Sequence, residues 1–201
     1  MTEIHMDQPL SHIHIGNALF NELKSRCKNK AIVLLCIGTD RCTGDSLGPL
    51  TGYNLNKNVY TRKNIHIHGT LDNPVHAKNL LETINTIHSK YESPFVIAVD
   101  ACLGNKESIG KIKLSNSPLR PGAGVNKNLP TVGDISILGI VNLGGFMEIM
   151  TLQSTRLNLV LKMSEVISKG IEFGIWKFLK ESSFNNLVDN QHIHIPYINS
   201  Y

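Results

Sequence analysis

The sequence contains few aromatic residues, few charges and no long apolar run. Aromatic residues make up 6% of the 201 residues and charged residues 18%, so we expect a core built mainly of Ile, Leu and Val. No stretch reaches the roughly 18 consecutive apolar residues that a membrane-spanning helix needs. Glu3, His5 and Asp7 stand near the start of the chain. We therefore expect neither a signal peptide nor a membrane contact.

The four cysteines and the glycines do not form the usual cofactor motifs. No two cysteines have CxxC spacing, which argues against a zinc knuckle and a thioredoxin-type site. Four thiols in a chain of this length do not make a disulfide framework, so we expect reduced cysteines in the cytoplasm. The glycines form neither GxGxxG nor a Walker loop, and we expect no nucleotide cofactor.

The charge of the chain is mildly basic, with a net value of +4. The densest basic run lies in residues 24–30, and no aromatic residues interleave its charges as stacking platforms would. A solvated helix end explains such a run without a partner. We therefore expect no direct nucleic-acid contact.

The first half of the chain alternates continuous apolar runs with helical periods. The predicted elements are strands over 31–37, 64–68 and 94–99, and helices over 46–56 and 75–89. Continuous apolar runs are typical of parallel strands that are buried on both faces. The alternation predicts an α/β fold: a three-layer α/β/α sandwich with a mostly parallel, mixed sheet of the phosphorylase/hydrolase-like type.

The second half of the chain completes this single domain, expected to span 1–201. Further elements are predicted as strands over 109–114 and 135–143 and a long helix over 157–180. Residues 115–130 hold three prolines and predict a long loop. Residues 1–15 are polar and rich in histidine, and we expect them to form a flexible tail or a weak edge segment.

Asp45 and Asp100 are the candidate catalytic residues. In open parallel sheets, ligands bind beyond the carboxyl ends of the strands. Asp100 directly follows one predicted strand, and Asp45 follows another after a short loop. Two close carboxylates share a proton, so one would activate water and the other would protonate an amide leaving group. On spacing alone, Asp45 would equally well cap the helix beginning at Ser46, and Asp100 would close a turn.

The motifs around the two acids resemble the spore germination protease superfamily. Asp45 begins Asp-Ser-Leu-Gly-Pro, which is similar to that superfamily's Asp-Ala-Leu-Gly-Pro element. Asp100 stands in Asp-Ala-Cys, which is similar to its second aspartate element. Residues 130–137, Pro-Thr-Val-Gly-Asp-Ile-Ser-Ile, resemble a segment of the YyaC-type sporulation proteins, a smaller branch of the group. The motifs occur in order over residues 31–145.

This resemblance implies a peptidase with Asp45 and Asp100 as its catalytic pair. It also implies a protein or peptide substrate, of which small acid-soluble spore proteins are an example. The expected location is then the cytoplasm of a sporulating cell or its forespore.

Five further residues are candidate substrate contacts: Arg41, Thr43, Ser46, Cys102 and Asp134. Arg41 would bind a substrate carboxylate or lower the pKa of a neighbouring acid, unless it is simply a solvated loop cation. A Cys102 nucleophile would need a base, whereas free cysteine is more often a small buried residue. Asp134 is either a third acid of the site or a turn residue after Gly133.

Two other functions remain open. The same fold and first acidic position recur in hydrogenase-maturation endopeptidases, where a histidine takes part in nickel recognition. No histidine stands directly after Pro130 here, so we expect no metal; His68, at i, i+2 from His66 on a strand, is the weak candidate ligand. The other open function is a non-catalytic protein that uses the same pocket to bind peptides.

Overall fold

A central mixed sheet of six strands organises the protein. A computed structural model describes residues 1–58, 64–121, 129–145 and 147–191, with side chains up to residue 183. The strands are β1 (Thr2–His5), β2 (Ile32–Cys36), β3 (Ile65–His68), β4 (Phe95–Gly104), β5 (Lys111–Ser115) and β6 (Ile135–Leu143). Their order in the sheet is β1-β5-β6-β4-β2-β3. The four strands from β6 to β3 pair in parallel, whereas β5 is antiparallel to β6 and β1 antiparallel to β5.

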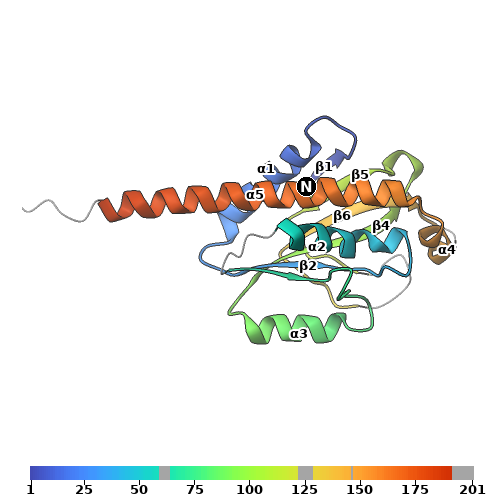
Figure 1. The fold of residues 1–201 in the computed structure, drawn as a ribbon, viewed down its shortest axis with the longest axis horizontal. Coiled ribbons are helices and arrows are strands. Elements are labelled where there is room, and N and C mark those ends of the chain that lie inside the picture. Colours follow the sequence, from blue (N-terminus) through green and yellow to red (C-terminus); the bar gives the residue numbers. More distant parts are fainter. Residues whose placement is uncertain (59–63, 122–128, 146, 192–201) are drawn as a thin grey trace, which may run out of the picture.

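Helices lie on both faces of the sheet, so the molecule has three layers (Figure 1). The helices are α1 (Ser11–Arg26), α2 (Leu47–Asn58), α3 (Leu80–Lys90), α4 (Glu148–Gln153) and α5 (Leu157–Gln191). The first, second and fifth cover one face, and α3 lies on the other (Figure 1). The predicted three-layer α/β/α fold is confirmed. None of the described helices combines the length and apolarity needed to cross a bilayer.

The apolar strands are buried because both faces of the sheet are covered. All five residues of β2 are buried. Successive side chains of a strand point to opposite faces. Leu34 therefore joins the core beneath α1, α2 and α5, whereas Val33 and Leu35 join the core beneath α3. This two-sided burial explains why the strand is a continuous apolar run.

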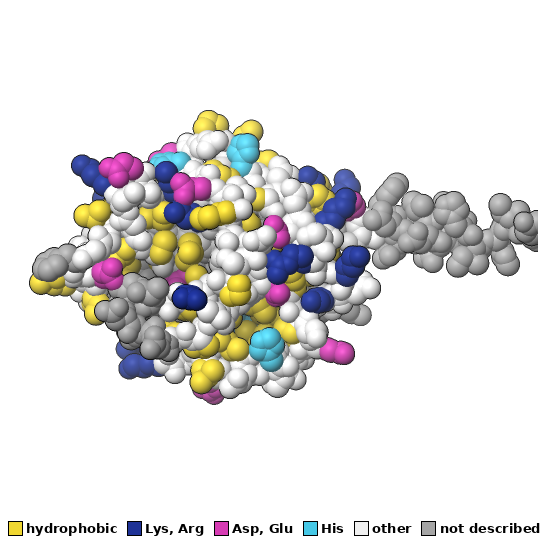
Figure 2. All heavy atoms as spheres, turned by 180° about the vertical axis from the view of Figure 1, so that it is seen from behind, with side chains coloured by type: hydrophobic (Ala, Val, Ile, Leu, Met, Phe, Trp, Pro, Cys, Tyr) yellow, Lys and Arg dark blue, Asp and Glu magenta, His cyan; other side chains and the backbone are white. Residues whose placement is uncertain are grey.

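Helices α1 and α5 pack backbone to backbone. A Cβ added to Gly174 would stand 2.7 Å from the carbonyl oxygen of Gly16, and one on Gly16 would stand 2.8 Å from that of Gly170. Only glycine permits this approach without moving one helix. An ion pair also joins the two helices, with Lys24 Nζ 2.6 Å from Glu181 Oε1. On the face shown in Figure 2, several Lys and Arg side chains gather near the end from which α5 projects, with a few Asp and Glu side chains among them.

Of the two structures predicted for residues 1–15, the flexible tail is wrong and the edge segment is correct. Residues 2–5 form the edge strand β1, and α1 begins at Ser11. Glu3 lies 2.9 Å from Lys111 and 3.1 Å from Lys113 of the neighbouring strand, and Ile4 is buried. These partners lie more than a hundred residues away along the chain, so the polar local composition did not indicate them.

Several predicted element boundaries differ from the structure. Strand β4 continues to Gly104 instead of ending at Val99, because it pairs with β6 along most of its length. Helix α3 begins at Leu80 instead of Val75, because Val75 forms a parallel bridge with Ile37. Within the loop predicted over 115–130, residues 122–128 lie outside the described part of the chain.

Candidate active site

The candidate site lies where β2 ends beside the middle of β4. These two strands are parallel neighbours, with Cys36 opposite Val99. The next residue, Ile37, still donates a backbone hydrogen bond to the Val99 carbonyl, at 2.7 Å. Asp100 is therefore level with the last sheet contact of β2. The chain leaves β2 at this level and turns toward Asp45.

Gly38 allows the loop after β2 to fold back onto the strand end. Its φ is +142°, and an added Cβ would stand 2.0 Å from the carbonyl oxygen of Asp45. The same carbonyl accepts a hydrogen bond from the Thr39 N–H, at 3.0 Å. A side chain at Gly38 would displace Asp45, so this glycine sets the position of the acid.

A 3-10 turn, η1 (Gly44–Ser46), carries Asp45. Ser46 Oγ donates to the Thr43 carbonyl at 2.6 Å, which closes the turn. Gly44 packs against the segment after α4, where an added Cβ would stand 2.8 Å from Thr155 Oγ1. Asp45 is the middle residue of this turn and is half-buried. Its backbone is thus fixed while its side chain keeps access to solvent.

Asp100 lies inside β4 and not in a turn. By strand alternation it shares a face with Ala98, above the core that contains Ile37 and Val75. Its β6 neighbour is Leu138. Asp100 is only 5% exposed, and its Oδ1 accepts one hydrogen bond from the Ala101 N–H, at 2.8 Å. Apolar neighbours therefore remove most of the water from this carboxyl group.

The two acids influence each other electrostatically. Burial raises the pKa of Asp100 well above its usual value, and the negative charge of Asp45 raises it further. The hydrogen bond from Ala101 opposes these effects but does not cancel them. The structure thus brings Asp45 and Asp100 together. Burial and the neighbouring negative charge thus favour the protonated form of Asp100, while Asp45 is the more exposed of the two acids.

The residues near Asp45 contribute to the site in different ways. Arg41 is exposed in the loop, and its backbone N–H donates to Thr39 Oγ1 at 3.3 Å. The carbonyl of Thr43 accepts both the N–H and the hydroxyl of Ser46. The Ser46 hydroxyl is thus committed to the turn and is buried. Arg41 and Thr43 remain accessible to a substrate, whereas Ser46 builds the turn.

Cys102 lies two residues after Asp100 on the same face of β4. Burial, and then the charge of Asp100, raise the pKa of its thiol to about 11, although Lys113 opposes this. A thiol with such a pKa stays protonated near neutral pH and is a poor nucleophile. Cys102 therefore forms part of the wall beside Asp100.

The structure does not bring Asp134 to this site. Asp134 precedes β6 at the opposite, amino-terminal edge of the sheet, where its carboxylate accepts the Val96 N–H at 2.9 Å. Val96 precedes Asp100 by four strand residues, or about 13 Å. The interpretation of Asp134 as a substrate contact beside Asp100 is corrected accordingly. Its hydrogen bonds begin the pairing of β4 and β6.

His68 is also separate from the two acids. His66 and His68 lie on the α3 face of the edge strand β3, where the His66 ring stacks on Tyr91 with centroids 4.1 Å apart. Burial, and then the charge of Lys90, lower the pKa of His68. Within the described residues, no three His, Cys, Asp or Glu side chains converge as metal ligands.

One polar residue at this edge was missed by the sequence reasoning. His76 was assigned to the start of the helix predicted over 75–89, but it lies in the loop before α3. Its Nδ1 is buried and has no hydrogen-bond partner. The flanking Asn73-Pro74 dipeptide, a common turn signal, would have indicated the loop but not the buried nitrogen.

Comparison with known proteins places the chain in a family. The family model described as "Protein of unknown function (DUF1256)" matches residues 3–170. The chain belongs to the DUF1256 family. The protein of Bacillus subtilis (strain 168) called "Uncharacterized protein YyaC" is 55% identical over 146 residues, which is 73% of this chain and 70% of that protein. The predicted likeness to YyaC-type proteins is thus confirmed, and Asp45, Asp100 and His76 all lie within the DUF1256 match.

A solved structure is also similar. It is the crystal structure of a NiFe hydrogenase maturation protease, HycI, from Thermococcus kodakarensis KOD1, with 17% sequence identity and a TM-score of 0.47. The match covers 77% of this chain and 99% of that one.

Proposed function

We propose that this DUF1256 protein is a peptidase that hydrolyses peptide bonds in spore-associated proteins, with Asp45 and Asp100 as its catalytic pair. One observation carries the proposal: Asp100 is buried beside a second carboxylate, and both burial and that charge raise its pKa. Buried acids that serve only the fold are usually paired with cations or satisfied by several donors. Two acids with different environments are instead typical of acid–base catalysis.

The environments assign a role to each acid. Asp45 is half-buried and reaches solvent, so in this mechanism it takes a proton from a water molecule as the water oxygen attacks the peptide carbonyl carbon. Burial favours the protonated form of Asp100, so in this mechanism it gives its proton to the amide nitrogen as the C–N bond breaks. The proton held by Asp45 then returns to Asp100 directly or through water. No metal cofactor is needed for these steps, and we expect cleavage to persist in EDTA.

The substrate class comes from the motif resemblance. The elements around Asp45 and Asp100 are similar to those of the spore germination protease superfamily, which acts on small acid-soluble spore proteins. The corresponding location is the cytoplasm of a sporulating cell or its forespore.

Digestion of acid-soluble spore proteins by matched variants tests the proposal. Wild type, Asp45→Asn and Asp40→Asn are incubated with these proteins, and the products are identified by mass spectrometry. Asp40 is an exposed acid of the same loop, so Asp40→Asn should cleave like wild type. Asp45→Asn should give no fragments. Equal cleavage by Asp45→Asn would exclude the acid pair, and binding without cleavage from pH 4 to pH 9 would favour a non-catalytic peptide-binding protein.

A further inference from the structure

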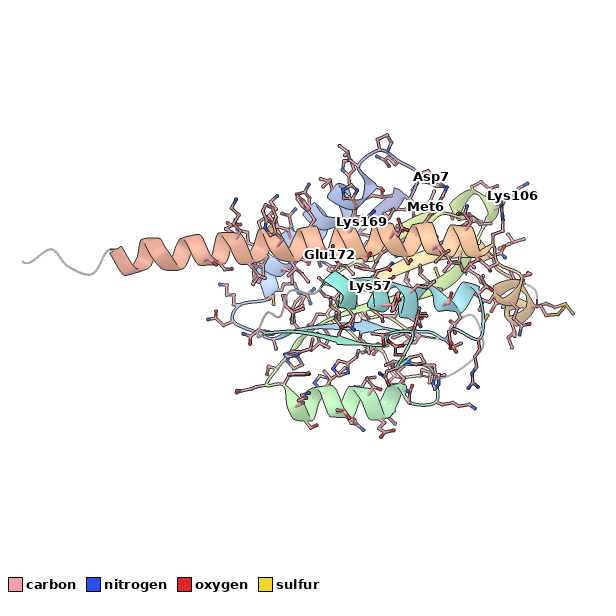
Figure 3. The ribbon with its side chains drawn as sticks, viewed as in Figure 1. Met6, Asp7, Lys57, Lys106, Lys169 and Glu172 are labelled. Atoms are coloured by element: carbon pink, nitrogen blue, oxygen red, sulfur yellow. The ribbon has the colours of Figure 1, made fainter. Side chains whose placement is uncertain are left out.

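Two buried side-chain atoms of the described residues have no hydrogen-bond partner: His76 Nδ1 and Glu172 Oε1. An unpaired buried polar atom costs roughly 1–3 kcal/mol, so folded proteins rarely keep one without a reason. Glu172 lies in the middle of α5, away from the α4 end of the molecule (Figure 3). His76 lies at the edge of the sheet that carries the two acids.

The backbone of His76 is held firmly. Its N–H donates to Asn79 Oδ1 at 2.8 Å. Its carbonyl accepts the N–H of Asn79 at 3.1 Å and that of Leu80 at 2.9 Å. Asn79 in turn donates through Nδ2 to the Pro74 carbonyl, at 3.0 Å. The unpaired Nδ1 therefore belongs to a residue whose backbone is fixed by hydrogen bonds, and not to a loosely placed loop.

Hydrogen bonds also place His76 across the strand end from Asp45. The carbonyl of the preceding residue, Val75, accepts the Gly38 N–H at 2.8 Å. The residue after Gly38, Thr39, donates its N–H to the Asp45 carbonyl at 3.0 Å. Gly38 is thus hydrogen-bonded to the segment that carries His76, and Thr39 is hydrogen-bonded to the turn that carries Asp45. Asp100 is level with this strand end through the pairing of β2 with β4.

We propose that His76 is a substrate-binding residue whose Nδ1 forms a hydrogen bond with a main-chain group of a peptide bound over Asp45 and Asp100. This inference rests on the proposed function and adds a residue to it. Imidazole Nδ1 donates in one neutral tautomer and accepts in the other, and a peptide main chain offers both kinds of partner. Nδ1 is buried in the free protein, so the imidazole ring would turn toward the peptide, which would then satisfy the nitrogen that the fold leaves unpaired.

Two substitutions of nearly equal shape test the hydrogen bond. His76→Asn keeps a polar atom near the position of Nδ1, whereas His76→Leu replaces it with a methyl group. For a purified acid-soluble spore protein, we expect KM to rise about tenfold in His76→Leu, equivalent to about 1.4 kcal/mol, and less than about threefold in His76→Asn. The Tm of His76→Leu should not fall, because the substitution removes an unpaired polar atom. His88→Leu, an exposed position on α3, is the control.

The opposite pattern would overturn the inference. If His76 only binds a structural water, His76→Leu should lower Tm and leave KM unchanged. A measurement on otherwise inactive protein makes the test independent of how His76→Leu folds. Uniformly 15N-labelled Asp100→Asn protein is titrated with the same spore protein, and the histidine ring nitrogens and the backbone amides are both followed by NMR. A shift of His76 Nδ1 on binding supports the contact.

The outcomes separate this inference from the proposed function. If amide signals of the Asp45 turn shift but His76 does not, the role of His76 is excluded and the site stands. If His76 shifts but wild type never cleaves the protein, the contact stands and the peptidase function is excluded. If nothing shifts, both are excluded for this class of substrate.

Discussion

The two edges of the parallel strands each hold an aspartate, and the two residues are used in opposite ways. At the amino edge, the Asp134 N–H donates to the Val96 carbonyl at 2.7 Å, and the Asp134 carboxylate accepts the Val96 N–H at 2.9 Å. Arg26 Nη1 donates to the Asp134 carbonyl at 3.0 Å, and Arg26 Nη2 lies 3.8 Å from its carboxylate. At the carboxyl edge, Asp100 accepts one backbone hydrogen bond and has a second acid as its neighbour.

This difference shows how partners decide what an acid does. The carboxylate of Asp134 has the Val96 N–H and Arg26 as partners within the fold, so it stabilises the start of two strands. The carboxyl of Asp100 is desolvated beside a like charge, so its ionisation is held back and its proton is available for transfer. The residue type is the same, and only the surroundings differ. Four measurements test whether the two edges differ in this way.

The largest expected effect is on turnover. Asp100→Asn should lower kcat by about 10²- to 10⁴-fold, the usual contribution of a general acid or base. Asp134→Asn should keep kcat within about threefold of wild type, because the residue lies at the other edge. Steady-state kinetics on one purified spore protein compares the two. Equal losses in both variants would mean that the edges do not differ in function.

The second expected effect is on stability at the amino edge. Asp134→Ala removes the acceptor of the Val96 N–H and the carboxylate near Arg26, and should cost about 1–3 kcal/mol of unfolding free energy. Most of this cost comes from the hydrogen bond, since the ion pair is partly exposed and worth less than about 1 kcal/mol. Urea unfolding measures it, with Asp40→Ala as the exposed control. A loss no greater than that of the control would show that Asp134 does not hold the strands.

The third expected effect is a gain in stability at the carboxyl edge. The folded protein raises the pKa of Asp100, so above the ordinary Asp range it binds more protons than the unfolded chain. Asp100 therefore costs stability as pH rises from about 4 through its folded pKa. Asp100→Asn should be more stable than wild type at pH 8, by on the order of 0.5–2 kcal/mol. The difference should shrink below pH 4, and a constant difference from pH 4 to pH 8 would contradict the raised pKa.

The smallest expected effect is on the titration of Asp100 itself. The charge of Asp45 contributes to the raised pKa after burial. Asp45→Asn should therefore lower the pKa of Asp100 without returning it to the ordinary value. Carbon-13 NMR of the aspartate carboxyls follows this titration. If the titration of Asp100 is unchanged in Asp45→Asn, the two acids do not interact. The control, Asp40→Asn, should leave the titration of Asp100 unchanged.

The sequence indicated the fold and the two acids, but placed several neighbouring residues wrongly. The continuous apolar runs predicted β2 and β4 because only strands buried on both faces are apolar throughout. The motifs indicated Asp45 and Asp100 as candidate catalytic residues. The same reasoning did not distinguish a tail from an edge segment for residues 1–15, and it assigned Asp134 to the site, because their partners are remote in sequence. His76 was missed because the lack of a hydrogen-bond partner is a property of the folded chain.

The segments that must be buried can be read from the sequence alone, because hydrophobic periodicity is a local property and the free energy of burial is large. These segments become the strands and helices. The sequence also determined that an aspartate stands in or just after each of two such segments. Three properties arise only in the folded chain. β2 and β4 become neighbours, Asp100 is desolvated beside Asp45, and Asp134 forms its hydrogen bonds with Val96 at the opposite edge. These properties depend on strand order and pairing register, which bring together groups that are distant along the chain.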